Sequence, residues 1–354
     1  MTSDGGHSTA GAPEGIDEGA VTRWITEHVA GTAAPLAFAL IAGGRSNLTY
    51  AVTDANGRRL ALRRPPLSHV LPTAHDMARE FRVLSALQDT AVPVPTTFGL
   101  CTDPAVNGSS FYVMEFVDGH ILRDAAAVEQ ALDVAARRRA SESMADTLAK
   151  LHAVDVDAVG LGDFAKRDGY IERQLRRWYE QFSNSQVAGV DTASIVGAVH
   201  DRLAAAVPAQ GATAIVHGDY RLNNTVLGDD GAVRAVLDWE ICTLGDPLAD
   251  LGLLMVYWTE PGDEASLVGV TPTALEGFSS RAEMRDRYAA TSGRDVSDLA
   301  FYVAFGYWKL ACIIQGVYAR YVGGATAGDG SSVDGFAHSV VALSQRAMAT
   351  LDES

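Results

Sequence analysis

Cysteine, positive charge and long apolar runs are all scarce in this chain of 354 residues. The three cysteines, Cys101, Cys242 and Cys312, lie far apart and form no CxxC pair, so the sequence indicates neither a zinc ribbon nor a disulfide framework. Lys and Arg total 28 against 44 Asp and Glu, which gives a formal net charge of −16. That balance argues against binding of nucleic acid or of an anionic membrane, because both need a basic face.

No stretch of about 20 apolar residues is evident in the sequence, so we expect no transmembrane helix. Residues 1–15 are small and polar, with no basic start and no apolar core. We therefore expect a disordered tail rather than a secretory signal, and a cytoplasmic protein. The length predicts two lobes, each large enough to bury its own core.

The first lobe, residues 16–117, has mostly strand character. Helical spacing predicts one helix over residues 17–29, with Asp17 as its cap, and a second over residues 76–88. Strands are predicted over residues 36–41, 48–53, 59–63, 97–101 and 111–117. This lobe should therefore be a small antiparallel sheet with one main helix after the third strand.

The second lobe, residues 118–354, is mostly helical, and the fold class is α+β. Helices are predicted over residues 126–153, 172–184, 193–207, 248–258, 272–291, 297–322 and 333–351. A short hairpin over residues 214–237 interrupts them, and polar residues stand at both of its ends.

The densest polar segment runs from His217 to Asn224 and is followed by Leu237-Asp238-Trp239-Glu240. Asp219 and Asn224 lie on a loop between two short strands, and Asp238 lies at the end of the partner strand. The hairpin can bring these three side chains together. Mg²⁺ takes few hard oxygen ligands from protein, and an outward carboxylate can accept a hydroxyl proton. The pattern therefore predicts Mg²⁺-dependent phosphoryl transfer.

The motif H-G-D-x-x-x-x-N, followed by D-W-E and G-D-P-x-x-D, resembles the aminoglycoside phosphotransferase-like family, relatives of choline kinase and of protein kinases. Residues 46–50, 112–115 and 245–250 are similar to the branch associated with acyl-CoA dehydrogenases. The resemblance implies a bilobal protein-kinase-like fold with ATP and Mg²⁺ as cofactors and the nucleotide between the lobes. It also implies that Asp219 is the catalytic base and that Asn224 and Asp238 are metal ligands.

The first lobe supplies the expected nucleotide contacts. The loop from Gly43 to Asn47, which includes Ser46, lacks the G-x-G-x-x-G of protein kinases but is suited to placing backbone N–H groups over phosphates. On the third strand, Ala61 is small enough for an adenine to lie against. Glu115 and Val117 are candidates for main-chain contacts with the adenine edge.

Arg63 occupies the position where kinases carry a lysine, and it is predicted to reach the α and β phosphates. Glu80 in the following helix would hold it. Arginine presents a fork of donors rather than a point charge, so the exchange is not neutral. The alternative is an exposed ion pair of little energetic consequence.

Two further polar features have competing interpretations. Arg173, Arg176 and Arg177 share one helical face and would suit an anionic group such as a coenzyme A phosphate; the alternative is a solvated face paired with nearby acids such as Glu172 and Glu180. For Asp246, which precedes Pro247, we favour a helix cap.

The expected substrate is a small molecule with a hydroxyl group. No dense acidic run for a polycation is present, and residues 299–321 are apolar and aromatic, which favours a lipid-like or acyl-CoA-linked alcohol. The alternatives are an aminoglycoside phosphotransferase and a nucleotide-binding pseudokinase that acts as an interaction module, which the Arg63 exchange supports. Nothing indicates flavin binding by an acyl-CoA dehydrogenase. The choice of ATP over GTP and the oligomeric state are left open.

Overall fold

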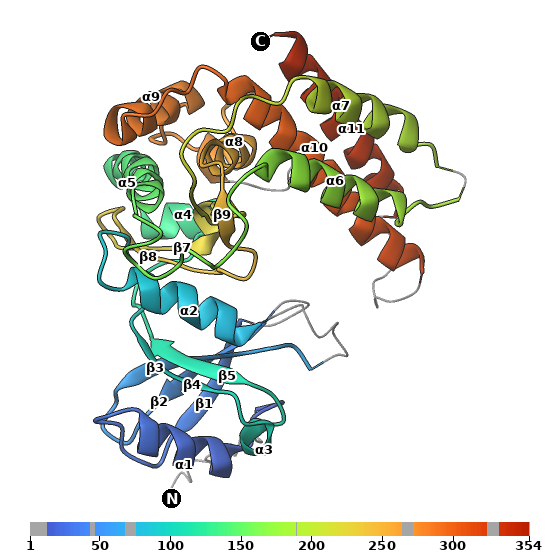
Figure 1. Ribbon diagram of the computed structural model, residues 1–354. Helices are drawn as coiled ribbons and strands as arrows, with labels where there is room; N and C mark the ends of the chain where they lie inside the picture. The colour runs from blue at the N-terminus through green and yellow to red at the C-terminus, as the bar shows by residue number, and fades with distance from the viewer. Residues whose placement is uncertain are drawn as a thin grey trace, which may run out of the picture. The chain divides into compact units, whose positions relative to one another are not determined.

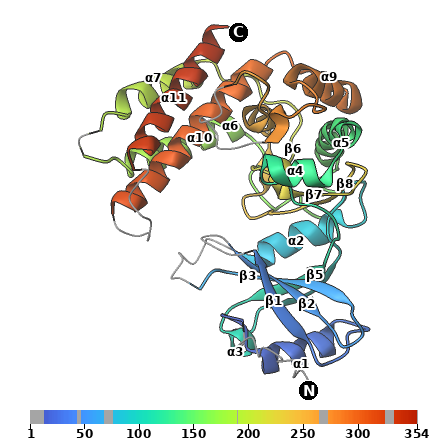
Figure 2. The same ribbon diagram turned by 180° about the vertical axis from the view of Figure 1, so that it is seen from behind.

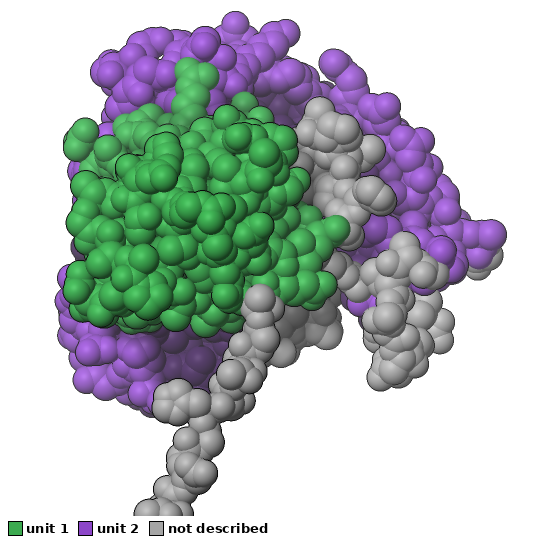
Figure 3. Space-filling model, turned by 90° about the horizontal axis from the view of Figure 1, so that it is seen from below, with its two compact units in different colours: residues 1–89, 94–118 green, residues 90–93, 119–354 purple. Residues whose placement is uncertain are grey.

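The computed structural model describes residues 13–42, 47–67, 76–188, 190–263, 272–323 and 333–353. The chain divides into two compact units, which Figure 3 colours separately. Unit 1 comprises residues 1–89 and 94–118, and unit 2 comprises residues 90–93 and 119–354. The connector 90–93 is part of unit 2, where the N–H of Val236 donates to the carbonyl of Pro93 at 2.8 Å.

Unit 1 is built on a five-stranded antiparallel sheet of order β1-β2-β3-β5-β4 (Figure 1). Its strands are β1 (Ala37–Ala42), β2 (Leu48–Thr53), β3 (Arg59–Arg64), β4 (Thr97–Cys101) and β5 (Phe111–Glu115). All five predicted strands are present. The last is two residues shorter than predicted, because β5 ends at Glu115 and Val117 lies beyond the strand.

The two faces of this sheet carry different side chains. Strand alternation turns Tyr50, Val52 and Leu62 toward α1 (Glu18–His28), with which they form an apolar core. The other face points Arg63 and Tyr112 toward α2 (Met77–Leu87), as their hydrogen bonds to that helix show. A short helix that the sequence did not predict, α3 (Pro104–Asn107), packs beside α1.

Unit 2 is mainly helical, as predicted. Its helices are α4 (Ala125–Ala131), α5 (Val134–His152), α6 (Tyr170–Ser183), α7 (Ala193–Ala205), α8 (Leu248–Tyr257), α9 (Arg281–Ser292), α10 (Leu299–Val322) and α11 (Val333–Asp352). The helix predicted over residues 126–153 is wrong in one respect. It is interrupted at Leu132 and Asp133. Asp133 is the N-cap of α5, and its side chain accepts the N–H of Ala136 at 2.6 Å.

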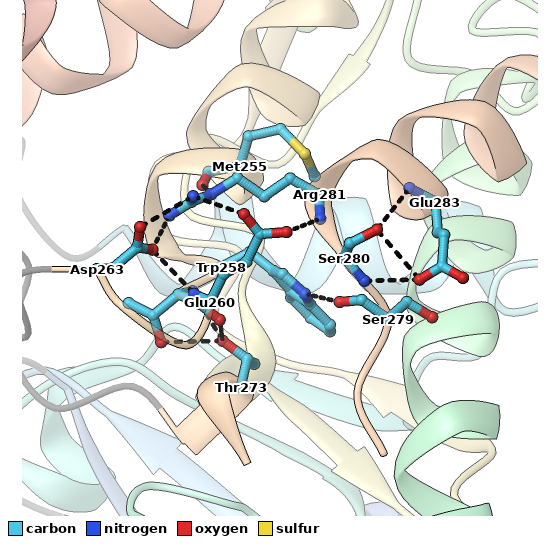
Figure 4. Close-up of polar contacts among 10 residues, drawn as sticks. Met255, Trp258, Glu260, Asp263, Thr273, Ser279, Ser280, Arg281 and Glu283 are labelled. Carbon is cyan, nitrogen blue, oxygen red and sulfur yellow. Dashed lines mark hydrogen bonds and ion pairs between the residues drawn. The ribbon is translucent and has the colours of Figure 1, made fainter. Parts of the chain in front are cut away.

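The helix predicted over residues 272–291 is also wrong in its first half. Residues 272–274 form only a 3₁₀ turn, and α9 begins after Ser280. Ser280 and Glu283 form a reciprocal capping box, which fixes that start (Figure 4). The next residue, Arg281, is anchored by ion pairs to Glu260 and Asp263 (Figure 4).

The predicted hairpin over residues 214–237 is in fact part of two small sheets. β7 (Thr225–Leu227) pairs with β8 (Val233–Val236), as the hairpin requires. β6 (Ala214–Val216) instead pairs with β9 (Thr243–Gly245), a strand that the sequence did not predict because it is only three residues long. The loop between β6 and β7 is thereby fixed at both ends.

Helix α10 is the central element of unit 2 and packs against α6, α8 and α11, with α11 running beside it in both views (Figures 1 and 2). Contrary to the sequence expectation, this helix is long and apolar enough to cross a membrane, the one such helix among the described residues. Of its apolar window, 72% is buried inside the structure. The apolar composition therefore has a packing explanation.

Contact between α8 and α10 depends on Gly252. A Cβ at this position would lie 2.5 Å from the backbone C and O atoms of Tyr302, which have no freedom to rotate away. We predict that Gly252→Ala lowers the free energy of unfolding by about 1–3 kcal/mol through overpacking, despite the better helix propensity of alanine. Urea unfolding of the full chain measures this change.

The matched control is Gly335→Ala on α11, where no described atom lies within 4 Å of the new Cβ. This variant should be as stable as the wild type or more stable by up to about 1 kcal/mol. A Gly252→Ala protein that matches it would contradict the packing argument.

Candidate active site

The loop from His217 to Asn224 connects β6 to β7 and is held in place by a side chain of α8. The carboxylate of Asp250 accepts the backbone N–H groups of His217 at 2.6 Å and Gly218 at 2.8 Å. Gly218 has a φ of +88°, which glycine adopts without strain. The loop backbone is therefore set by a buried carboxylate and a left-handed glycine.

The imidazole of His217 joins this loop to the segment after β8. Its Nδ1 accepts the N–H of Asp219 at 3.2 Å, so Nε2 carries the proton and donates to the carbonyl of Leu237 at 2.9 Å. The ring also packs against Trp239, with 4.7 Å between ring centroids. His217 thus positions the loop.

The loop brings Asp219 and Asn224 into direct contact. The amide Nδ2 of Asn224 donates to the carbonyl oxygen and to the Oδ2 atom of Asp219, both at 2.9 Å. Its Oδ1 atom is therefore left as an acceptor. Across the hairpin, the N–H of Leu237 donates to the carbonyl of Asn224 at 2.8 Å, and Asp238 follows immediately. Asp238 has a φ of +67°, which is uncommon outside glycine.

The residue types at this loop can be compared with what a Mg²⁺ ion requires. No group of three or more His, Cys, Asp or Glu residues able to hold a metal is found in the described part of the chain. Asn224 and Asp238 form a smaller set of hard oxygen donors, which suits an ion that keeps waters and phosphate oxygens as its other ligands. The catalytic and metal-binding roles of Asp219, Asn224 and Asp238 stay predictions.

Sequence reasoning missed Lys309 on α10. Its Nζ atom donates to the carbonyl of Gly218 at 2.9 Å, next to Asp219. Burial lowers the pKa of Lys309, while the carboxylates of Asp219 and Asp250 act in the opposite direction. A lone lysine in the apolar pattern of residues 299–322 was the signal that could have drawn attention to it.

Arg221 and Tyr257 also surround Asp219. The Nε atom of Arg221 lies 3.2 Å from the Oδ2 atom of Asp219, and its guanidinium lies 4.8 Å from the ring centre of Tyr257. Burial and the charge of Asp219 raise the pKa of Tyr257. Asp219 therefore faces a permanent positive charge and a neutral phenol.

A second layer of polar groups supports Asp250. His152 Nε2 lies 3.3 Å from its Oδ2 atom, and His152 Nδ1 lies 2.8 Å from the hydroxyl of Tyr288. Burial lowers the pKa of His152, so the ring is neutral. Burial acts to raise the pKa of Asp250, but its hydrogen bonds outweigh this effect and lower it.

Asp246 caps α8, as predicted. Its Oδ1 atom accepts the N–H of Leu248 at 3.0 Å. Its Oδ2 atom accepts the hydroxyl of Tyr302 at 2.6 Å, which ties the start of α8 to α10 as well. This second contact explains why the residue is buried.

In unit 1, Arg63 and Glu80 form a buried ion pair. The Nε atom of Arg63 lies 2.8 Å from the Oε2 atom of Glu80, and the two side chains are 12% and 2% exposed. Glu80 also accepts the Tyr112 hydroxyl at 3.0 Å and the Asn47 amide at 2.6 Å. The alternative of an exposed pair is therefore wrong.

The positions of the other residues predicted to bind the nucleotide give less information about that role. Ala61 is buried beside Arg63 on β3. The N–H of Glu115 already donates to the carbonyl of Thr96 at 2.8 Å, so it is not an available donor to adenine. Val117 lies half-buried past the end of β5, and Ser46 lies outside the described residues. Their roles stay predictions.

Comparison with known proteins identifies the family. The model of the phosphotransferase enzyme family, APH, matches residues 37–293, which include the sheet of unit 1 and the loop of Asp219. The chain belongs to this phosphotransferase family. The predicted family is confirmed.

A curated relative of this phosphotransferase-family chain is the Arabidopsis thaliana protein named "Probable acyl-CoA dehydrogenase IBR3". The two are 36% identical over 336 residues, which is 89% of this chain but only 40% of the relative. The chain therefore spans less than half the length of that protein.

Two solved structures support the predicted fold. An aminoglycoside phosphotransferase candidate from Ralstonia eutropha is 33% identical, with a TM-score of 0.77 over 94% of this chain and 99% of the other. Choline kinase from Cryptosporidium parvum has a TM-score of 0.64 at 12% identity, over 95% and 96% of the two chains. The kinase-like α+β fold class is confirmed.

The buried His152 makes the stability of this phosphotransferase-family chain depend on pH. Below pH 6.5, the ordinary pKa of histidine, His152 is protonated in the unfolded chain but stays neutral in the folded chain until the pH is lower still. Stability is therefore present above pH 6.5 and falls as the pH drops, by up to about 1.4 kcal/mol per pH unit for one proton. In His152→Gln this contribution to the slope between pH 6.5 and 5 should disappear.

Urea unfolding at several pH values measures the slope. His338→Gln, which changes an exposed histidine of α11, is the control and should keep the wild-type slope. An unchanged slope in His152→Gln would show that the proton is taken up elsewhere.

Proposed function

We propose that this chain is an ATP- and Mg²⁺-dependent small-molecule kinase that transfers the γ-phosphoryl group of ATP to a hydroxyl group. The observation that carries the proposal is the contact of Asp219 with Asn224 on a fixed loop, with Asp238 following Leu237, whose N–H donates to the carbonyl of Asn224. A base and oxygen donors for Mg²⁺, here proposed to be Asp219, Asn224 and Asp238, are the parts that phosphoryl transfer needs.

In the proposed reaction, Asp219 orients the acceptor hydroxyl and accepts its proton. A bond forms between the acceptor oxygen and the γ-phosphorus, and the bond from that phosphorus to the β–γ bridging oxygen breaks to release ADP. Asn224 and Asp238 would hold Mg²⁺, which supplies charge neutralisation when bound. Catalysis rests on positioning and electrostatics more than on covalent chemistry by the protein.

Lys309 and Arg221 prepare Asp219 for this role. Lys309 holds the carbonyl of the preceding residue, Gly218, and so fixes the peptide from which the carboxylate projects. The guanidinium of Arg221 lies beside the carboxylate, with 3.2 Å between Nε and the Oδ2 atom of Asp219, and helps to fix its orientation.

Arg63 is proposed to hold the nucleotide phosphates. Glu80 holds the Nε side of its guanidinium, and Nη1 donates to the hydroxyl of Thr49 at 3.4 Å. A guanidinium is a planar fork of donors whose geometry matches phosphate oxygens. The buried ion pair of Arg63 and Glu80 supports a positioned guanidinium. It therefore argues against a pseudokinase in which arginine in place of lysine no longer positions the nucleotide.

The proposed acceptor is a lipid-like or acyl-CoA-linked alcohol. Similarity to a relative named as an acyl-CoA dehydrogenase supports this class. An aminoglycoside acceptor is the second candidate, favoured by the name of the Ralstonia eutropha structure. A nucleotide-consumption screen against hydroxyacyl-CoAs, amino alcohols and aminoglycosides separates the two.

Replacing the proposed base should abolish turnover and spare binding. Asp219→Asn retains an oxygen that can accept from Asn224 but removes the proton acceptor. We expect acceptor-dependent ATP consumption to fall by about 10²–10⁴-fold, with ATP affinity little changed. Coupled ADP detection and calorimetry measure the two quantities.

The control is Asp286→Asn, an exposed carboxylate on α9 that should leave both values unchanged. If wild-type protein binds ATP but consumes none with any acceptor, the pseudokinase is favoured. If it binds no ATP, the proposal fails.

The Arg63 fork can be tested separately. Arg63→Ala should weaken ATP binding by at least about tenfold, since a charged hydrogen bond contributes about 1.5–3 kcal/mol. Arg63→Lys restores the charge without the fork and should recover part of the affinity. Equal ATP affinity in all three proteins would remove Arg63 from the nucleotide site.

A further inference from the structure

A cavity of about 440 Å³ in unit 2 is lined by four cationic side chains. Arg173, Arg176 and Arg177 come from α6, and Lys166 comes from the segment before it. Glu180 is the one acidic side chain among the lining residues. In a chain with a net charge of −16, this local excess of positive charge runs against the overall balance.

Among the described residues, no ion pair joins these four cations to an acidic side chain, so the expected pairing with Glu172 and Glu180 is not seen. Arg176 and Arg177 are exposed, as expected of a solvated face. Arg173 donates through Nη2 to the carbonyl of Lys166 at 2.6 Å. Its Nη1 atom is buried and has no hydrogen-bond partner among the described residues. A buried donor of this kind costs free energy until a ligand supplies an acceptor.

The cavity lies close to the loop that carries Asp219. Its lining includes Thr243 of β9, which pairs with Val216, the residue immediately before the loop. A second link runs through Trp178. Arg177 lies 5.4 Å and Lys309 lies 5.6 Å from the centre of its ring, and Lys309 bonds to the loop at Gly218.

We propose that this cavity is an anion site that binds a phosphate or pyrophosphate group of the acceptor substrate, with the acceptor hydroxyl directed to Asp219. The inference rests on the proposed kinase function, and it narrows the acceptor to molecules that already carry a phosphate. Arginine suits this role because its planar fork offers paired donors to phosphate oxygens. A polycationic acceptor would be repelled.

The test is calorimetric titration of pyrophosphate into the full chain without Mg²⁺ and with saturating ADP, which occupies the proposed nucleotide site. Wild-type protein should bind, and affinity should fall as salt rises. The triple variant Arg173→Gln, Arg176→Gln and Arg177→Gln should bind at least about tenfold more weakly, because it loses several charged hydrogen bonds. Circular dichroism checks its fold, and Arg176→Gln alone, at an exposed position, should weaken binding in the same direction.

The matched control removes three positive charges elsewhere in unit 2, with Arg202→Gln, Arg234→Gln and Arg285→Gln. It should keep the wild-type affinity for pyrophosphate. No binding by the wild type, or equal weakening in both triple variants, would overturn the anion site. The same titration with ADP alone reports nucleotide binding, so failure of the kinase proposal is seen separately.

Discussion

A single buried carboxylate, that of Asp250, holds the arrangement of the site together. It accepts two backbone N–H groups of the loop and faces the ring of His152. Its side chain is only 1% exposed. An isolated charge in such a place would be strongly unfavourable, and only this full set of donors makes it tolerable. Because the donors belong to the loop backbone, their hydrogen bonds stabilise the loop in this conformation. The position of Asp219 is a consequence.

Unit 1 uses the same physical device. Glu80 is nearly inaccessible to solvent and receives hydrogen bonds from Arg63, Tyr112 and Asn47, which come from the strands β3 and β5 and from the start of β2. In both units a buried carboxylate orients hydrogen-bond donors. These donors include backbone amides in unit 2 and a guanidinium in unit 1. Since each donor is oriented before any ligand arrives, binding would require little reorganisation.

Local signals were enough for most of the fold. The strands of unit 1 and the helices α6, α8 and α10 lie close to their predicted positions, because the apolar period is encoded over a few neighbouring residues. Local signals failed where a longer-range contact decided the outcome. Asp133 caps α5 and breaks a continuous helical pattern, and β9 forms only because β6 lies beside it. Likewise, the apolar composition of α10 is explained only by its burial against the surrounding helices.

The sequence by itself determined the residue types of the site, the order of Asp219, Asn224 and Asp238 along the chain, and the cluster of arginines on one helix face. Only the tertiary structure decided which groups meet them. Lys309 reaches Gly218 across 91 residues of sequence, and the arginines of α6 line one cavity with Lys166 and Thr243. Spacing along a chain fixes local geometry through backbone sterics and hydrogen bonds. Contacts between distant segments depend on how whole helices pack, and no short pattern encodes that packing.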